Sequence, residues 1–350
     1  MLKTSILLLA LIMISTQAKS QDLNTNAEKY VRLVLSLGQL DPDYVDAYYG
    51  PPEWREEAKA KPKTLDQIAK EAQELHASLK ALKTDKLAEL EQRRLKFITR
   101  QLEALLARVE IVKGKKLSFD EESQALYDAV APQHTEKDFQ PVLDEINKLI
   151  PGEGDLSTRY SKFKQDFIIP KEKLDEVFRT AIQECRSRTA KHIQMPSGEN
   201  FKVEYVQGKS WSAYNWYQGN YQSIIQMNTD LPVSIDRAID LACHEGYPGH
   251  HVLNMLIEKN LVRGHGWKEF SVYPLFSPLS LIAEGTANYG IHVAFPGDER
   301  MKYEKQVLFP LAGLNADRAE TFYKVQELVD HLSHECGIAN GARHWSKMIK

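Results

Sequence analysis

The chain has 350 residues, of which 43% are hydrophobic and 27% are charged, a balance typical of one large or two modest globular domains. The formal net charge is −3, from 45 basic and 48 acidic residues. Because there is no basic excess, nothing in the composition indicates a nucleic-acid partner. Three cysteines are too few for a disulfide scaffold.

The first twenty residues have the pattern of a secretory signal. Lys3 gives a positive start, residues 5–15 are mostly apolar, and Ala18 and Ser20 place small residues just before a cleavage site at Gln21. The apolar run is shorter than the roughly 20 residues that span a bilayer. We therefore expect an exported protein, periplasmic or extracellular, with no stable membrane span after cleavage. The alternative is an uncleaved membrane anchor.

The region from residue 21 to residue 195 is predicted to be helical, because apolar residues recur at helical spacing among Leu, Ala, Glu, Lys and Arg. The second and third of its helices are expected to form a hairpin. Residues 48–64 are interpreted as a proline-rich connection. Five helices are predicted, at residues 26–40, 65–82, 85–114, 136–150 and 170–195.

The pattern changes after Pro196. Short aromatic and β-branched runs predict a small antiparallel sheet at 201–228, and we expect its last strand, 221–228, to have an exposed edge that pairs with an extended peptide. Helices are predicted to resume from about Ser234. The fold class is therefore mostly α (α+β), with a signal at 1–20, a helical region at 21–195 and a metal-binding region at 196–350, the last two forming one continuous unit. The later helices are predicted to begin near 234 and after 250, and to cover 276–292 and 314–335.

The segment HEGYPGHH, residues 244–251, places two histidines after a His-Glu pair at unusual spacing. The zinc-binding pattern H-E-x-x-H has its histidines four residues apart, on one face of a helix. On an unbroken helix His250 would point roughly 120° away from His244, and His251 would lie about 10 Å farther along the axis. Neither could share a metal ion with His244 on a regular helix.

The residues between the histidines predict an interrupted helix. Pro248 lacks the N–H that would bond to the carbonyl of His244, and glycines on both sides admit backbone angles that other residues avoid. We expect a bulge from Gly246 to Gly249 and a new helix near His250, preceded by a helix with Ser234 as N-cap. His250 is the predicted second ligand, with His251 as the alternative.

A third ligand is predicted on the helix at 278–293, which carries a single acidic residue, Glu284. Its apolar neighbours predict that Glu284 is buried and paired with a cation, and Gly285 is expected to allow a close backbone approach. Catalytic zinc usually has three protein ligands and an open position for water. His244, His250 and Glu284 would supply this set.

Several supporting roles remain open at this stage. A histidine ligand usually donates its other N–H to an acceptor, for which Asp240 and Asn288 are candidates. Cys185 and Cys336 are a possible disulfide of an exported protein, and Cys243 is interpreted as a small buried thiol in preference to a metal ligand. The candidate donors to a reaction oxyanion are Tyr289, Tyr303, Tyr323, His331 and His334.

Two of these segments carry a family resemblance. HEGYPGHH followed by AEGTANY, at 283–289, resembles the bacterial domain-of-unknown-function family 885, and DYVDAYYGPPEW, at 43–54, is similar to a recurring stretch of these exported proteins. That family resembles zinc metallopeptidases of the gluzincin-like type. The resemblance implies a multi-helix metallopeptidase-like domain that binds zinc through His244, His250 and Glu284, with Glu245 as the acid/base.

The functional expectation is an exported zinc-dependent peptidase in which Glu245 is the general base for a metal-activated water. Its partner would be a peptide or small amide substrate. Two alternatives remain: a zinc hydrolase of a non-peptide or cell-wall amide, and a non-catalytic helical binding protein with a relict metal site.

Overall fold

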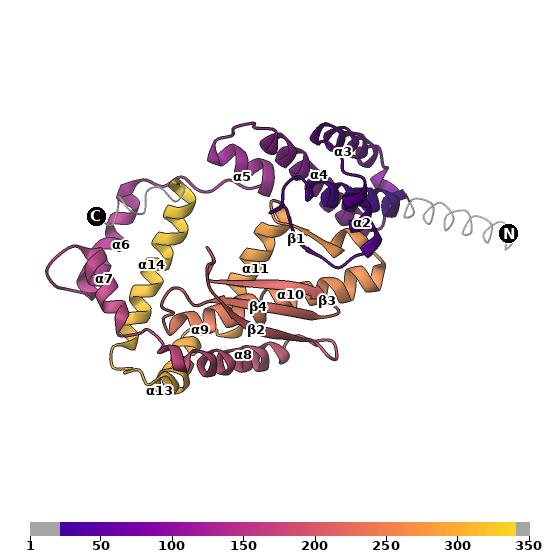
Figure 1. Cartoon of the computed structure of the whole chain (residues 1–350). Helices are drawn as coiled ribbons and strands as arrows, with labels where there is room; N and C mark the ends of the chain where they lie inside the picture. Colours follow the sequence, from indigo (N-terminus) through magenta and orange to yellow (C-terminus); the bar gives the residue numbers. More distant parts are fainter. Residues whose placement is uncertain (1–21, 341–350) are drawn as a thin grey trace, which may run out of the picture. The chain divides into compact units, whose positions relative to one another are not determined.

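The computed structural model describes the backbone of residues 22–340 and their side chains except those of Lys86 and residues 333–340. The predicted signal segment, residues 1–20, lies outside the described residues. The described part of the chain is mostly helical and has two small sheets, which confirms the predicted mostly α (α+β) class (Figure 1). In the part of the chain that is described, none of the helices combines the length and apolarity needed to cross a membrane.

The described residues form two compact units, each assembled from segments that are distant in sequence. The first unit comprises residues 22–129, Trp216–Gln222 and Asn254–Ala283, and the second comprises Val130–Asn215, Ser223–Leu253 and residues 284–340. The predicted boundary near residue 196 remains a prediction.

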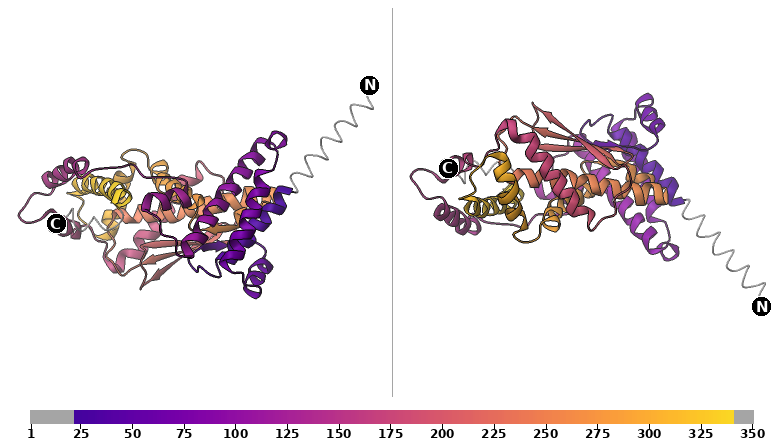
Figure 2. Two further views of the ribbon diagram at one scale, coloured as in Figure 1. Left: turned by 90° about the horizontal axis from the view of Figure 1, so that it is seen from above. Right: turned by 90° about the horizontal axis from the view of Figure 1, so that it is seen from below.

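The second unit contains most of the later helices. Within it, α6 and α14 lie side by side (Figures 1 and 2), and α8 packs against α9. α10 and α11 contribute residues to both units. The helices concerned are α6 (Glu136–Leu149), α7 (Leu156–Gln165), α8 (Leu174–Ala190), α9 (Asp236–Leu241), α10 (His250–Ile257), α11 (Pro278–Ala294), α12 (Glu299–Tyr303), α13 (Phe309–Ala312) and α14 (Ala319–Asn340).

The predicted sheet consists of β2 (Asn200–Val206), β3 (Ala213–Gly219) and β4 (Gln222–Asn228) in the order β2-β4-β3. β3 and β4 are joined by a tight turn at Asn220 and Tyr221, both with positive φ, as in a two-residue hairpin. Because β4 is the central strand, both of its edges are occupied. The expectation that this strand offers a free edge to a peptide is therefore wrong.

The first unit begins with a helix at residues 22–37 and contains the predicted hairpin of α3 (Leu65–Lys80) and α4 (Glu89–Val112), which pack against each other. A short helix was not expected in the connection before α3, but Pro52 lies in the first turn of α2, where proline is tolerated. The other elements are β1 (Val45–Tyr48), α2 (Pro52–Ala60), α5 (Phe119–Tyr127) and β5 (Val272–Pro274), with β1 and β5 paired antiparallel.

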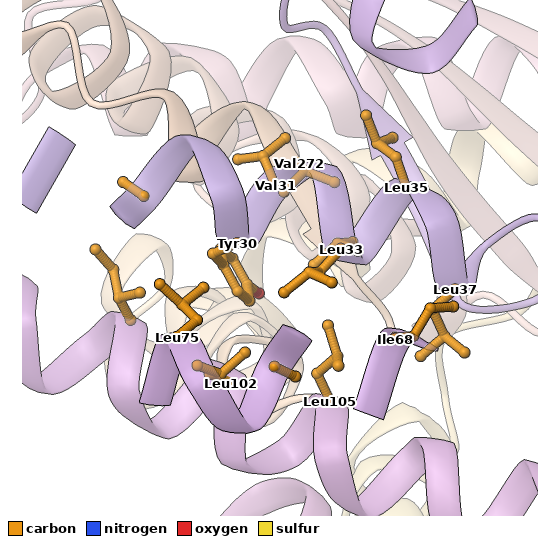
Figure 3. Packing of buried hydrophobic residues seen from close by; sticks show 14 of the residues in the cluster. Tyr30, Val31, Leu33, Leu35, Leu37, Ile68, Leu75, Leu102, Leu105 and Val272 are labelled. Carbon is orange, nitrogen blue, oxygen red and sulfur yellow. The ribbon is translucent and has the colours of Figure 1, made fainter. Parts of the chain in front are cut away.

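The hydrophobic core of this unit lies between its first helix and the α3–α4 hairpin. Tyr30 and Val31 of the first helix, Ile68 of α3 and Leu102 of α4 are all almost completely buried (Figure 3). Full burial of a large apolar side chain stabilises a fold by on the order of 1.5–3 kcal/mol. Burial of the apolar faces of these amphipathic helices therefore accounts for their packing.

One ion pair is buried in the same unit. The guanidinium of Arg94 donates two hydrogen bonds to the carboxylate of Glu269 and a third, of 2.6 Å, to Asn24. It also lies 4.6 Å from the ring centre of Trp267. Both charged side chains are almost completely excluded from solvent, so each depends on the other for compensation.

We predict that Arg94→Ala lowers the free energy of unfolding by about 3–5 kcal/mol, because it leaves the Glu269 carboxylate buried without its partner. The neighbouring Arg93 makes an exposed pair with Glu89 and serves as the matched control, since Arg93→Ala should change stability little. Urea denaturation of the two variants checks the difference. Equal losses would contradict the importance of the buried pair.

Candidate metal centre

The helix that carries His244 is interrupted where the sequence predicts. α9 ends at Leu241, a π-helical turn covers Ala242–Gly246, and α10 begins at His250. The predicted cap is wrong, because α9 begins at Asp236 after Ile235, and the hydroxyl of Ser234 is buried without a hydrogen-bond partner.

Two glycines allow the chain to fold back on itself here, but for a different reason from the one expected. Neither Gly246 nor Gly249 has a positive φ, so unusual backbone angles are not their role. A Cβ at Gly249 would lie 1.8 Å from the carbonyl oxygen of His244, and one at Gly246 would lie 3.1 Å from the ring of Phe201. The Gly249 N–H donates to the carbonyl of Cys243 at 2.9 Å. Glycine therefore occupies these two positions because there is little room for a side chain.

This fold-back brings His250 next to His244, and Glu284 of α11 completes the group. The two Nε2 atoms are 3.1 Å apart; that of His244 is 3.3 Å from Oε2 of Glu284, and that of His250 is 3.3 Å from Oε1. Among the described residues, these three form the one group of His, Cys, Asp and Glu whose ligand atoms lie close enough to hold a metal ion.

The spacing of these ligand atoms fits a small divalent ion. Nitrogen and oxygen ligands bind zinc at about 2.0–2.1 Å, and tetrahedral geometry then separates neighbouring ligand atoms by roughly 3.3 Å. Two imidazoles and one carboxylate are also a ligand set that zinc and similar transition metals accept. The three side chains therefore meet both the geometric and the chemical requirement for a metal centre.

The exposure of Glu284 differs from the expectation. Its side chain is 52% exposed, not buried, because α11 turns several apolar residues, including Ile282 and Tyr289, toward solvent. A Cβ at Gly285 would meet open space, so the close approach expected there is absent as well. The Glu284 carboxylate thus reaches the two histidines from an open side of the site.

The charges within the triangle act on one another. Burial alone would lower the pKa of His244, but the Glu284 carboxylate and the charge of Glu245 outweigh it and raise the pKa. For Glu284 the effects are reversed: burial would raise the pKa of its carboxyl group, but contacts with His244 and His250 lower that pKa far below its usual range. The Glu284 carboxylate is therefore ionised, the state in which it binds a cation.

His251, the alternative ligand, lies elsewhere. It is completely buried, its Nδ1 is 2.9 Å from the hydroxyl of Ser223, and its Nε2 is 3.1 Å from the carboxylate of Glu199. Both ring nitrogens are thus engaged away from the triangle. The structure therefore brings His250, and not His251, to His244 and Glu284.

A buried polar network that the sequence did not reveal holds the interrupted segment. Glu199 also accepts hydrogen bonds from Tyr247, at 2.6 Å, and from Arg186. Burial would raise the pKa of Glu199, but its bonds with His251, Tyr247 and Arg186 lower it. The segment that separates the two histidines is thereby tied to the residue that precedes β2.

The sheet also supports the π-helical turn that carries His244 and Glu245. Asn215 of β3 donates from Nδ2 to the carbonyl of Glu245 at 2.7 Å. A lone Asn before a Trp gives no sequence signal for this role, because the partner is a backbone atom. The role of Glu199 could not be predicted from the sequence either, because this residue precedes a strand and has no histidine next to it in the chain.

Glu245 follows His244 within the π-helical turn and is only 6% exposed. Burial raises its pKa above the ordinary glutamate value, although His250 and His244 oppose this shift. A buried carboxylate with a raised pKa is a stronger base than an ordinary one, which suits a group that accepts and returns a proton beside a candidate metal site.

The second partner of His244 is Asn288, not Asp240. The Nδ1 of His244 lies 2.9 Å from Oδ1 of Asn288, one turn after Glu284 on α11. Asp240 is instead paired with Arg237. If His244 carries its proton on Nδ1, this contact is a hydrogen bond that leaves Nε2 free to bind a metal.

A cavity of about 560 Å³ in the second unit reaches Asn288 and Asp240. Three of the candidate oxyanion donors, Tyr289, Tyr323 and His331, line it. Tyr303 instead packs against Phe295, and the side chain of His334 lies outside the described residues. The cavity therefore adjoins the residue that orients the first histidine.

We predict that His250→Ala weakens zinc binding by more than the roughly 10- to 100-fold that loss of a supporting partner costs, because it removes a direct ligand. His251→Gln should keep one zinc per chain, while lowering the stability of the fold. Competition against a chromogenic chelator measures both affinities. A greater loss in His251→Gln, in a folded protein, would reverse the assignment.

A second prediction concerns the space at Gly249. Gly249→Ala should lower zinc affinity, because its methyl group must displace the His244 carbonyl and with it the imidazole. Gly285→Ala is the matched control: it lies beside Glu284, its methyl group meets open space, and alanine favours a helix by roughly 0.5–1 kcal/mol. The same chelator titration and a thermal melt compare the two variants.

Comparisons of the whole chain with protein-family models, with curated proteins and with solved structures found no match.

Proposed function

We propose that this chain is a zinc-dependent peptidase whose metal ion is bound by His244, His250 and Glu284. The observation that carries the proposal is the convergence of three side chains across an interrupted helix: the two Nε2 atoms are 3.1 Å apart, and each is 3.3 Å from one of the two Glu284 carboxylate oxygens. The buried Glu245 beside it supports a hydrolytic role. Membership of domain-of-unknown-function family 885, with its gluzincin-like site, is part of the proposal and rests on the motifs alone.

A zinc ion bound in the triangle would supply a Lewis acid that polarises the scissile carbonyl and lowers the pKa of a water. Glu245 accepts a proton from the attacking water and passes it to the leaving amine. Its burial suits both steps, because a raised pKa makes the carboxylate a stronger base and its protonated form persists closer to neutral pH.

Asn288 and the buried network position the candidate ligands before a metal or substrate binds. The Asn288 amide oxygen holds the ring of His244 in place, and Glu199, Tyr247 and His251 hold the chain between the two histidines. These residues keep the ligand atoms close together, so little reorganisation is needed when a metal binds.

The open side of the site provides a place for substrate. Glu284 is half-exposed, and Tyr289, one turn away on α11, is 69% exposed and also lines the neighbouring cavity. A peptide entering from this side reaches both the metal ligands and the cavity. The export of the protein is a further part of the proposal, supported by the signal pattern of residues 1–20.

We predict that Glu245→Gln keeps zinc at one ion per chain but lowers kcat for peptide hydrolysis by about 10²- to 10⁴-fold, the usual contribution of a general base. Elemental analysis and a fluorogenic peptide library give the two readings. The control is Glu320→Gln, an exposed residue paired with Lys305, which should retain full activity.

The outcomes separate the candidate functions. Zinc without turnover of any peptide, but with Glu245-dependent hydrolysis of other amides, would replace the peptidase by a different zinc hydrolase. Zinc with neither activity would favour a binding protein with a relict site. Failure of the purified protein to bind zinc at all would refute both enzyme readings.

A further inference from the structure

We propose that Cys185 and Cys243 form a disulfide bond that ties α8 to the π-helical turn carrying His244. This proposal requires neither metal binding nor hydrolysis of a substrate, but it rests on the proposed export, because disulfides persist in oxidising compartments. It also replaces the pairing of Cys185 with Cys336 that the sequence allows.

The two sulfur atoms already lie against each other. Their separation is 2.7 Å, well inside ordinary contact for two sulfurs, and both residues are completely buried. A disulfide requires about 2.05 Å, so the sulfurs need to approach by only about 0.7 Å. α8 and the π-helical turn pack directly against each other, so the contact joins two well-packed elements.

The chemistry requires an oxidant, which we identify by class as a disulfide compound, such as the oxidised form of a small thiol or of a dithiol protein. The thiolate of one cysteine attacks the oxidant and displaces a thiol, and the second cysteine then displaces the other. One S–S bond forms in the protein and one breaks in the oxidant. The two electrons and two protons of the cysteine thiols end in two oxidant thiols.

The bond must form before the fold is complete. Complete burial raises the pKa of the Cys185 thiol well above its ordinary value, and the neighbouring Cys243 raises it further. The reactive thiolate is therefore scarce in the folded protein, and no oxidant reaches either sulfur. For the same reasons a bond formed during folding is protected from reductants afterwards.

The bond would also act on the candidate metal centre. Cys243 directly precedes His244, and its carbonyl accepts the hydrogen bond from Gly249. The link joins positions 58 residues apart, so it restricts a long loop in the unfolded chain. The folded protein gains stability at the turn on which the two histidines depend.

The test is to unfold the chain, refold it in a glutathione redox buffer, and count thiols in denaturant without reductant. We expect one reactive thiol per chain, from Cys336, and a proteolytic peptide pair that joins Cys185 to Cys243. Protein refolded with a phosphine reductant should melt roughly 5 °C lower than the oxidised form. Three reactive thiols, or a link to Cys336, would overturn the proposal.

Two variants provide further tests of which cysteines are linked. Cys336→Ser should leave no reactive thiol and the same linked peptides. Cys185→Ser should expose two thiols and show no difference in melting temperature between oxidising and reducing conditions. If Cys185→Ser fails to fold, the thiol count of the unaltered chain and of Cys336→Ser still decides, since two reactive thiols in the latter would refute the bond.

Discussion

The candidate site depends on the close approach of the chain to itself at Gly249. The backbone there passes so near the His244 carbonyl that no side chain fits, and this brings residue 250 back beside residue 244. A regular helix would separate the two imidazoles by roughly 120° around its axis. The six-residue spacing is compatible with a shared ion only because the intervening segment abandons helical geometry and then resumes it at His250.

An interruption of this kind needs support, since three residues leave the helix in a buried region. The support comes from polar groups outside the helix. Asn215 binds the Glu245 carbonyl, and Glu199 collects hydrogen bonds from Tyr247 and His251. His251 is thus a structural residue beside a candidate ligand, and two adjacent histidines of one motif have different partners. A buried carboxylate with several donors is satisfied, so the network can hold a single arrangement of the turn.

The predictions succeeded where the controlling interactions are local. The amphipathic spacing of α3 and α4 determines which faces are buried, and the proline and glycines around residue 248 determine where the helix stops. The three side chains of the candidate site could be chosen from their chemistry and their helical setting, and the structure brings them together. What failed depends on tertiary structure: the central position of β4 is set by pairing with β2, and no feature of its own residues reveals it.

Glu284 shows the same limit at the site itself. Its apolar neighbours predicted burial, but several of them face solvent, and the carboxylate is half-exposed. That exposure affects how the centre can be interpreted. A structural metal site is closed by four protein ligands, whereas a catalytic one keeps a position open. Here three candidate ligands converge, one from an open side, and burial raises the pKa of the adjacent Glu245. Perturbed pKa values cluster at sites that perform chemistry, so this feature, together with the open side, supports the proposed hydrolytic centre over a metal that only holds the fold together.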